Sequence, residues 1–257
     1  MKLKIRQYGN GGQTLVILHG LLGSSKNWHG TGAALGTHFN VIVPDLRNHG
    51  ESPHAEHSIE AMREDLEEFF DELQLDKPFL LGHSMGGLSA MSFAVTNETR
   101  IRGLIVVDIS PQVDLTRMAW IFEALQRVDL NKITNRQEAN RQLSAAITAD
   151  SVRQFLLQNL QRQENGAHRW RCNLPALFEF ITANEPFKLP PLSRYSGPTL
   201  FIGGEQSEHK IANKVEVIAQ HFPNYQLVMF PNTGHWVHYE AMNAFVKRVV
   251  CFIRENS

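Results

Sequence analysis

The chain has 257 residues, and its 25 Lys and Arg against 26 Asp and Glu give a formal net charge of −1. This length suits one large domain or a domain with an insertion, and the balanced charge argues against a nucleic-acid partner. Two distant cysteines, Cys172 and Cys251, argue against a disulfide framework or a zinc site. We expect a cytoplasmic monomer or homodimer without a membrane span, because no segment reaches the ~18 apolar residues that a span requires.

Short apolar runs, each ended by glycine or a turn, indicate the strands. Residues 1–6 alternate charged and apolar side chains, which predicts a first strand. Continuous apolar runs of this length are typical of strands covered on both faces, as in a parallel sheet. The runs are residues 14–18, 40–43, 79–81, 101–107, 199–202 and 226–230.

Helical patterns separate these runs. In residues 58–73 apolar side chains recur on one face of a 3.6-residue period, and Ser58 precedes them as a candidate N-cap. Residues 239–253 repeat the pattern, with Tyr239 on the apolar face. Strands alternating with helices predict an α/β fold around a mostly parallel central sheet.

One long stretch interrupts the alternation. From about Pro111 to Ser196 the sequence has helical periodicity and no convincing strand. We therefore expect a core of residues 1–110 and 197–257, with an inserted helical cap at 111–196. Within the cap, residues 131–163 are rich in Arg, Gln and Asn, and could instead form a mobile linker.

The strongest chemical signal is the G-x-S-x-G pattern of residues 82–86. It follows a predicted strand and precedes a predicted helix, the setting in which a sharp turn exposes a nucleophilic serine. Ser84 is thus the predicted nucleophile, and an ordinary glycine turn is the alternative.

A serine hydroxyl needs a base, and the chain has 12 histidines. His235 follows the last predicted strand, at the edge of the sheet where ligands bind in open α/β folds. We predict His235 as the base, and we expect His238 on a helix surface and the His83 ring directed away from the Ser84 hydroxyl.

A carboxylate must orient the base. The loop at residues 203–208 is a usual place for it, yet Ser207 lies where an aspartate is expected. Asp108 follows the strand after the elbow, and we predict it as the acid. Glu205 and Glu208 are alternatives, and a local turn role for Asp108 is another.

Two backbone amides must stabilise the oxyanion. We predict those of Met85, directly after the nucleophile, and Leu21, in the glycine-containing loop after an earlier strand. Asp45 begins a polar loop, and we expect it to bind backbone amides rather than act as the acid. Residues assigned to substrate binding are His19, Gly20 and Trp236.

Five segments together resemble α/β-hydrolases of the YbfF-type esterase group. The resemblance implies hydrolysis of short- to medium-chain acyl esters, with acyl-CoA thioesters as an open alternative, and no metal or other cofactor. It also implies a cap whose apolar residues line the acyl pocket. The segments are residues 19–23, 45–53, 82–87, 108–111 and 234–236.

Other functions fit the same predicted residues. A C–C bond hydrolase or a cofactorless haloperoxidase could use this triad, and a ligand-binding protein could retain a relict triad. Dehalogenases and epoxide hydrolases are disfavoured, because their chemistry requires a carboxylate nucleophile where Ser84 lies.

Overall fold

The computed structural model of the chain describes residues 1–183 and 186–257, with a seven-stranded sheet in the order β1-β3-β2-β4-β5-β10-β11. Strand β1 pairs with β3 in the antiparallel direction, and every other neighbouring pair in this sheet is parallel. The predicted α/β class with a mostly parallel sheet is confirmed. The strands are β1 Ile5–Tyr8, β2 Thr14–Leu18, β3 Asn40–Pro44, β4 Phe79–His83, β5 Gly103–Val107, β10 Thr199–Gly204 and β11 Tyr225–Phe230.

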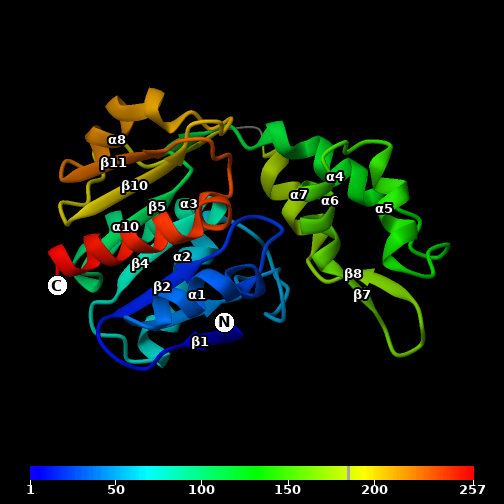
Figure 1. The fold of residues 1–257 in the computed structure, drawn as a ribbon, viewed down its shortest axis with the longest axis horizontal. Helices are drawn as coiled ribbons and strands as arrows, with labels where there is room; N and C mark the ends of the chain where they lie inside the picture. The colour runs from blue at the N-terminus through cyan, green and yellow to red at the C-terminus, as the bar shows by residue number, and fades with distance from the viewer. Residues whose placement is uncertain (184–185) are drawn as a thin grey trace.

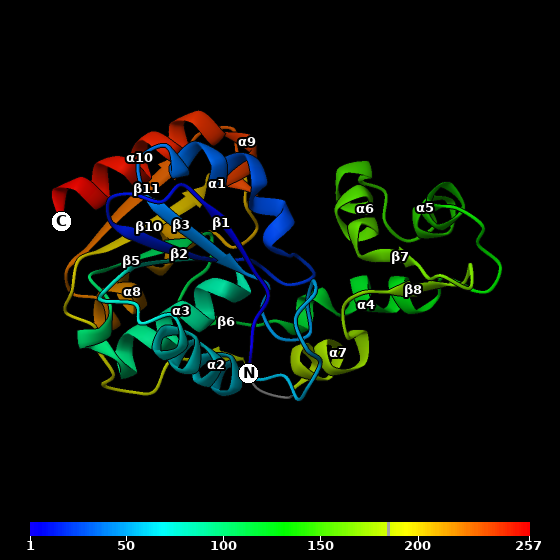
Figure 2. The same cartoon turned by 90° about the horizontal axis from the view of Figure 1, so that it is seen from below.

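Helices cover both faces of the sheet (Figures 1 and 2). Helices α1 and α10 pack on one face, and α2, α3 and α8 pack on the other. Successive residues of β2 show why both faces need cover: Leu15 and Ile17 belong to one buried cluster, and Val16 and Leu18 belong to the other. The helices are α1 His29–Gly36, α2 Ile59–Glu72, α3 Met85–Thr96, α8 Val215–His221, α9 Val237–Glu240 and α10 Met242–Glu255.

Local sequence explains where these helices begin and end. The Ser58 hydroxyl accepts a hydrogen bond from the Ala61 amide, the predicted N-cap of α2. The predicted single helix at 239–253 is wrong, because Ala241 leaves the helical conformation and separates α9 from α10. Tyr239 is consequently 79% exposed rather than buried. Within the described residues, no helix combines the length and apolar character needed to cross a bilayer.

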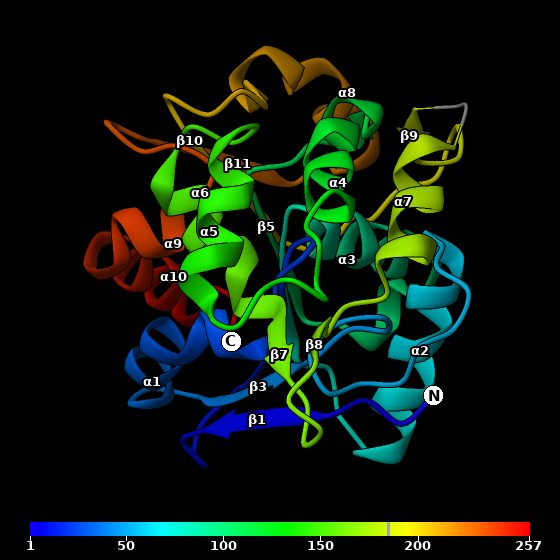
Figure 3. The same ribbon diagram turned by 90° about the vertical axis from the view of Figure 1, so that its right-hand side faces the viewer.

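The segment between β5 and β10 lies to one side of the sheet, and Figure 3 views the molecule from that side. Residues 136–156, within the possible linker, are mostly helical. The bounds of the cap, 111–196, stay a prediction, and residues 184 and 185 lie outside the described residues. The helices here are α4 Ala119–Gln126, α5 Arg136–Ser144, α6 Asp150–Leu156 and α7 Leu174–Thr182.

The expectation of a cap without strands is wrong. Strand β6 pairs with β9, and β7 pairs with β8 across a turn that contains Gly166 at φ +84°. Ladders of two or three residues are too short to show a period of two in the sequence. The strands are β6 Gln112–Val113, β7 Leu160–Arg162, β8 His168–Trp170 and β9 Phe187–Lys188; the 3-10 helices are η1 Ser25–Trp28, η2 Glu98–Arg100, η3 Thr116–Met118, η4 Leu157–Asn159 and η5 Ile211–Lys214.

A buried ion pair anchors the loop after β3 to α2. The Arg47 guanidinium donates to both carboxylate oxygens of Asp65, at 2.6 and 2.8 Å, and to the carbonyl of Glu56 at 2.8 Å. Asp45 at the start of the loop accepts from the Ser25 and Glu51 amides, which is the structural role expected from the sequence.

Removing Asp65 should therefore destabilise the fold. Asp65→Ala leaves the buried Arg47 charge unpaired, and we expect the free energy of unfolding in urea to fall by about 3–5 kcal/mol. The control is Asp71→Ala, on the same helix, which removes an exposed pair with Arg100 and should cost less than about 1 kcal/mol. Equal losses for both variants would contradict the assigned role of the buried pair.

Candidate active site

Ser84 occupies a strained turn between β4 and α3. Its φ of 52° lies in a region that non-glycine residues adopt at a cost of about 1–3 kcal/mol. The turn is tight enough that a Cβ on Gly82 would lie 2.2 Å from the Gly86 carbonyl oxygen, so glycine is required there. This backbone has the geometry of a nucleophile elbow, at the carboxyl end of the central strand β4.

Asp108 and His235 meet at the same edge of the sheet. Asp108 follows β5, its side chain is fully buried, and its Oδ2 lies 2.7 Å from Nδ1 of His235. Since the carboxylate accepts from Nδ1–H, Nε2 is left without a proton and can act as a base. Glu205 is exposed, and the Glu208 side chain is 91% exposed and lies near Arg117, which favours Asp108 as the partner of His235.

Two further donors satisfy the buried carboxylate. The Gly204 amide donates to Asp108 Oδ1 at 3.1 Å, and the Ser207 hydroxyl donates to Oδ2. Sequence reasoning missed this contact of Ser207, which lies where an aspartate was expected. A carboxylate at that position would face the charge of Asp108 directly, whereas a hydroxyl stabilises it.

Two neutral imidazoles flank the His235 ring. The rings of His83 and His209 lie 4.6 and 4.7 Å from it, and His83 Nε2 donates to the His235 carbonyl at 2.9 Å. Burial lowers the pKa of His83 well below its usual value and the pKa of His209 to about 4. Both rings therefore remain uncharged near neutral pH, where a cation would oppose protonation of His235.

His238 is also part of this cluster, and its predicted position on a helix surface is wrong. The side chain is 4% exposed, and its ring stacks on Trp28 at 4.1 Å between centroids. The cause is the short α9, which turns this residue toward the sheet face covered by α1. Its Nδ1 is buried without a hydrogen-bond partner among the described residues.

Asp108, His209 and His235 each offer a ligand atom within 4.8 Å of the others, the one such group that the described residues contain. A metal ion could be held there only at the expense of the bond between Asp108 and His235. The donor set therefore suits a hydrogen-bonded pair better than a resident ion.

The two predicted oxyanion donors lie in suitable settings. The Met85 amide is at the first residue of α3, and neither it nor the Leu21 amide has a hydrogen-bond partner in the part of the chain that the structure describes. Gly20 lies close to the elbow, since a Cβ there would be 3.2 Å from Cβ of Ser84. The two amides stay predictions as oxyanion donors, and so does the contact of Gly20 with substrate.

The sequence assigned substrate binding to His19, and the structure gives its side chain a different role. The ring is 1% exposed; Nδ1 donates to the Gly20 carbonyl and Nε2 accepts from the Leu46 amide. Both ring nitrogens are engaged, so the ring supports the loop, and contact of His19 with a substrate stays a prediction. Trp236, in contrast, is half-buried and packs against Phe155 of α6 at 5.4 Å, between core and cap.

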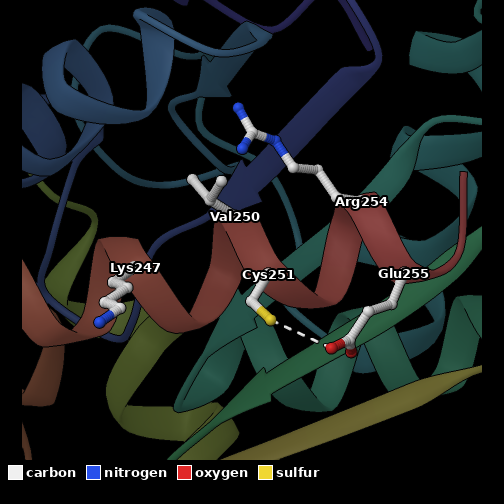
Figure 4. Close-up of a pocket in the computed structure, with 5 residues that line it drawn as sticks. All are labelled: Lys247, Val250, Cys251, Arg254 and Glu255. Carbon is white, nitrogen blue, oxygen red and sulfur yellow. Dashed lines mark hydrogen bonds between the residues drawn. The ribbon is translucent and has the colours of Figure 1, made fainter.

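A surface hollow elsewhere carries no part of this site. Figure 4 shows it along α10, lined by Lys247, Val250, Cys251, Arg254 and Glu255. None of these residues comes from the loops that hold Ser84, Asp108 or His235. The hollow is therefore separate from the candidate active site.

Residues 13–241 match the model of a protein family whose description is "alpha/beta hydrolase fold". The chain belongs to the α/β-hydrolase family. This hydrolase is 35% identical over 257 residues to sn-1-specific diacylglycerol lipase ABHD11 of Danio rerio, covering 96% of this chain and 80% of that protein. It is 30% identical over 261 residues to Esterase YbfF of Escherichia coli, covering 99% and 100%.

A solved structure supports the same family. A marine microorganism esterase superposes with a TM-score of 0.89 at 34% identity, over 98% of this chain and 99% of that chain. The predicted resemblance to the YbfF-type group is confirmed, and so is the prediction of a carboxylic ester hydrolase.

The buried His238 should make this hydrolase less stable in acid. Burial lowers the pKa of His238 to about 3, below the ordinary value of about 6.5 in the unfolded chain. The unfolded state thus binds the proton first, and stability is lost as the pH falls below about 6.5. His238→Phe keeps an aromatic ring on Trp28 and removes the penalty, worth roughly 2 kcal/mol at pH 5.

Urea unfolding at pH 7 and pH 5 measures this effect. We expect the loss of stability between the two pH values to be smaller in His238→Phe than in the wild type. His38→Phe, at an exposed histidine, is the matched control and should keep the wild-type pH dependence. An unchanged pH dependence in His238→Phe would contradict the view that buried His238 causes the loss of stability in acid.

Proposed function

We propose that this hydrolase is a serine esterase that cleaves short- to medium-chain acyl esters through Ser84, His235 and Asp108. The supporting observation is the 2.7 Å bond between His235 Nδ1 and the buried Asp108 carboxylate, at the sheet edge where the elbow presents Ser84. A base oriented by a buried carboxylate, at the same sheet edge as the serine, supports the proposal because acyl transfer requires a nucleophile and an oriented base.

The proposed reaction begins when His235 Nε2 takes the proton of the Ser84 hydroxyl as its oxygen attacks the ester carbonyl. Asp108 stabilises the imidazolium that forms. The Leu21 and Met85 amides bind the oxyanion of the tetrahedral intermediate. His235 then protonates the departing alcohol, and the acyl group remains on Ser84.

Water completes the cycle in a second step. His235 activates a water molecule, which attacks the acyl-enzyme and releases the acid. The Ser84 hydroxyl makes no hydrogen bond to the residues that the structure describes, and such contacts often tighten only when substrate binds. No step in this sequence requires a metal or an organic cofactor.

The substrate belongs to the proposal as well. Trp236 and Phe155 form an apolar contact between core and cap near His235, which suits an acyl chain better than a charged group. The name of the ABHD11 relative adds glycerolipid esters to the candidates. Turnover of p-nitrophenyl esters and acyl-CoAs of increasing chain length measures the depth of the pocket and separates oxygen esters from thioesters.

Replacing the nucleophile tests the proposal most directly. Ser84→Ala removes the attacking oxygen, and we expect p-nitrophenyl ester hydrolysis to fall to background while the thermal transition stays cooperative. A fluorophosphonate probe should label the wild type at Ser84 and leave the variant unlabelled. Hydrolysis at the wild-type rate in Ser84→Ala would refute the mechanism, and tight ligand retention with negligible turnover in the wild type would favour a non-catalytic binding protein.

The acid is tested by Asp108→Asn. The amide cannot stabilise the imidazolium or hold the correct tautomer, and we expect kcat to fall by roughly 10⁴. Glu208→Gln and Glu205→Gln are the matched controls, since both carboxylates are exposed, and both should retain wild-type kcat. If Asp108→Asn were fully active and a control were impaired, the acid would have to be reassigned.

A further inference from the structure

Leu22 has an unusual backbone beside the proposed oxyanion donor Leu21. Residues 20–23 form a turn closed by a 3.0 Å bond from the Gly23 amide to the Gly20 carbonyl. Leu22 is the third residue of this turn and has φ of +59°, where glycine or asparagine is preferred. A branched side chain holds this conformation only when its surroundings support it.

The Leu22 amide is supported by a buried histidine of the core. It donates to His49 Nε2 at 3.1 Å, and His49 Nδ1 donates to the Arg47 carbonyl at 2.9 Å. The second bond fixes the tautomer that leaves Nε2 as an acceptor. Burial keeps the pKa of His49 well below its usual value, so the acceptor persists in mildly acidic solution.

The Leu22 carbonyl is supported from the cap. Asn159, in η4, donates from Nδ2 to the Leu22 carbonyl at 2.7 Å. The Asn159 side chain is 5% exposed and lies 137 residues away in the sequence. Asn159 Nδ2 also lies 3.4 Å from the carbonyl of Leu156 in the preceding turn, so the Leu22 carbonyl is its shorter contact. A buried amide that reaches a distant backbone carbonyl in this way indicates a specific contact, because an unpaired polar group at that depth is costly.

We propose that His49 and Asn159 are positioning residues for the oxyanion hole. Together they hold both polar backbone groups of Leu22, and the resulting turn leaves the Leu21 amide without a partner among the described residues. One of the two supports belongs to the cap, so docking of the cap completes the catalytic geometry. This inference rests on the proposed function, because the oxyanion hole that these residues would support is needed only if the proposed reaction takes place.

The proposal separates Asn159 from the other contacts between core and cap. The Gln158 side-chain carbonyl accepts from Asn27 Nδ2 at 2.7 Å. The backbone amide of Asn173 donates to the backbone carbonyl of Asn48 at 3.0 Å. These bonds also hold the cap, yet neither reaches Leu22. Gln158, next to Asn159, therefore provides a control for docking of the cap alone.

Kinetics of Asn159→Leu test the inference. Leucine has a similar size and cannot donate, so we expect kcat for a p-nitrophenyl ester to fall about 10- to 100-fold, with KM within about twofold. Gln158→Ala should retain wild-type kcat and KM. His49→Ala should resemble Asn159→Leu, and His49→Gln, which keeps an acceptor, should recover part of the rate.

Two kinetic results would overturn the inference. One is wild-type kcat in folded Asn159→Leu, and the other is a raised KM at unchanged kcat, which would place Asn159 in substrate binding instead. Amide hydrogen exchange over residues 20–23 gives a readout that does not depend on activity. We expect faster exchange in Asn159→Leu and wild-type exchange in Gln158→Ala, and equal exchange in the two would also overturn it.

The same set of variants separates this inference from the proposed function. A wild type that neither hydrolyses esters nor reacts at Ser84 with a fluorophosphonate would defeat the proposed function. The exchange measurement would still decide whether Asn159 and His49 hold the turn. If exchange in Asn159→Leu and His49→Ala matches the wild type in an active enzyme, the positioning role alone fails.

Discussion

A buried carboxylate that needs hydrogen-bond donors determines the arrangement of the site. Asp108 is fully buried, and burying an unpaired charge is so costly that each of its oxygens must be satisfied. Its donors are the Gly204 amide, the Ser207 hydroxyl and the His235 ring, all at least 96 residues away. Only the adjacency of β5 and β10, and of β10 and β11, brings these loops to one edge of the sheet. The geometry of the candidate site therefore depends first on strand order and then on the loops.

Uncharged histidines support the loops of the candidate site. His19, His49 and His83 each occupy a buried position where one imidazole joins two loops or backs the His235 ring. Burial lowers the pKa of all three, so each remains a neutral hydrogen-bonding group near pH 7. Protonation would cost each ring an acceptor or place a cation beside His235. An imidazole-rich site thus gains precise bonds at neutral pH and loses stability in acid.

Features that depend on local pattern could be predicted from the sequence. The apolar runs located every strand of the sheet except β1, which was expected at residues 1–6 and lies at Ile5–Tyr8. Glycine spacing located the elbow at Ser84, and both signals follow from backbone sterics within a few residues. The approach of Asp108 to His235 followed from topology. By contrast, the buried position of His238, the structural role of His19 and the contact of Asn159 depend on partners far away in the chain. No periodicity or spacing encodes such contacts. The short cap strands were not predicted for a related reason, since two or three residues cannot show a period of two.

The loop after β3 connects several parts of the candidate site. It contains no group that touches the reacting atoms, yet Asp45 holds the start of η1, Arg47 ties the loop to α2, and His49 holds Leu22. These bonds connect the loop to η1 and to α2, and the bond from His49 connects it to the turn that contains Leu21. Because the turn is strained at Leu22, it needs support from the core on one side and from the cap on the other. A polar loop that supplies no member of the proposed triad therefore supports the proposed reaction through the position of the Leu21 amide.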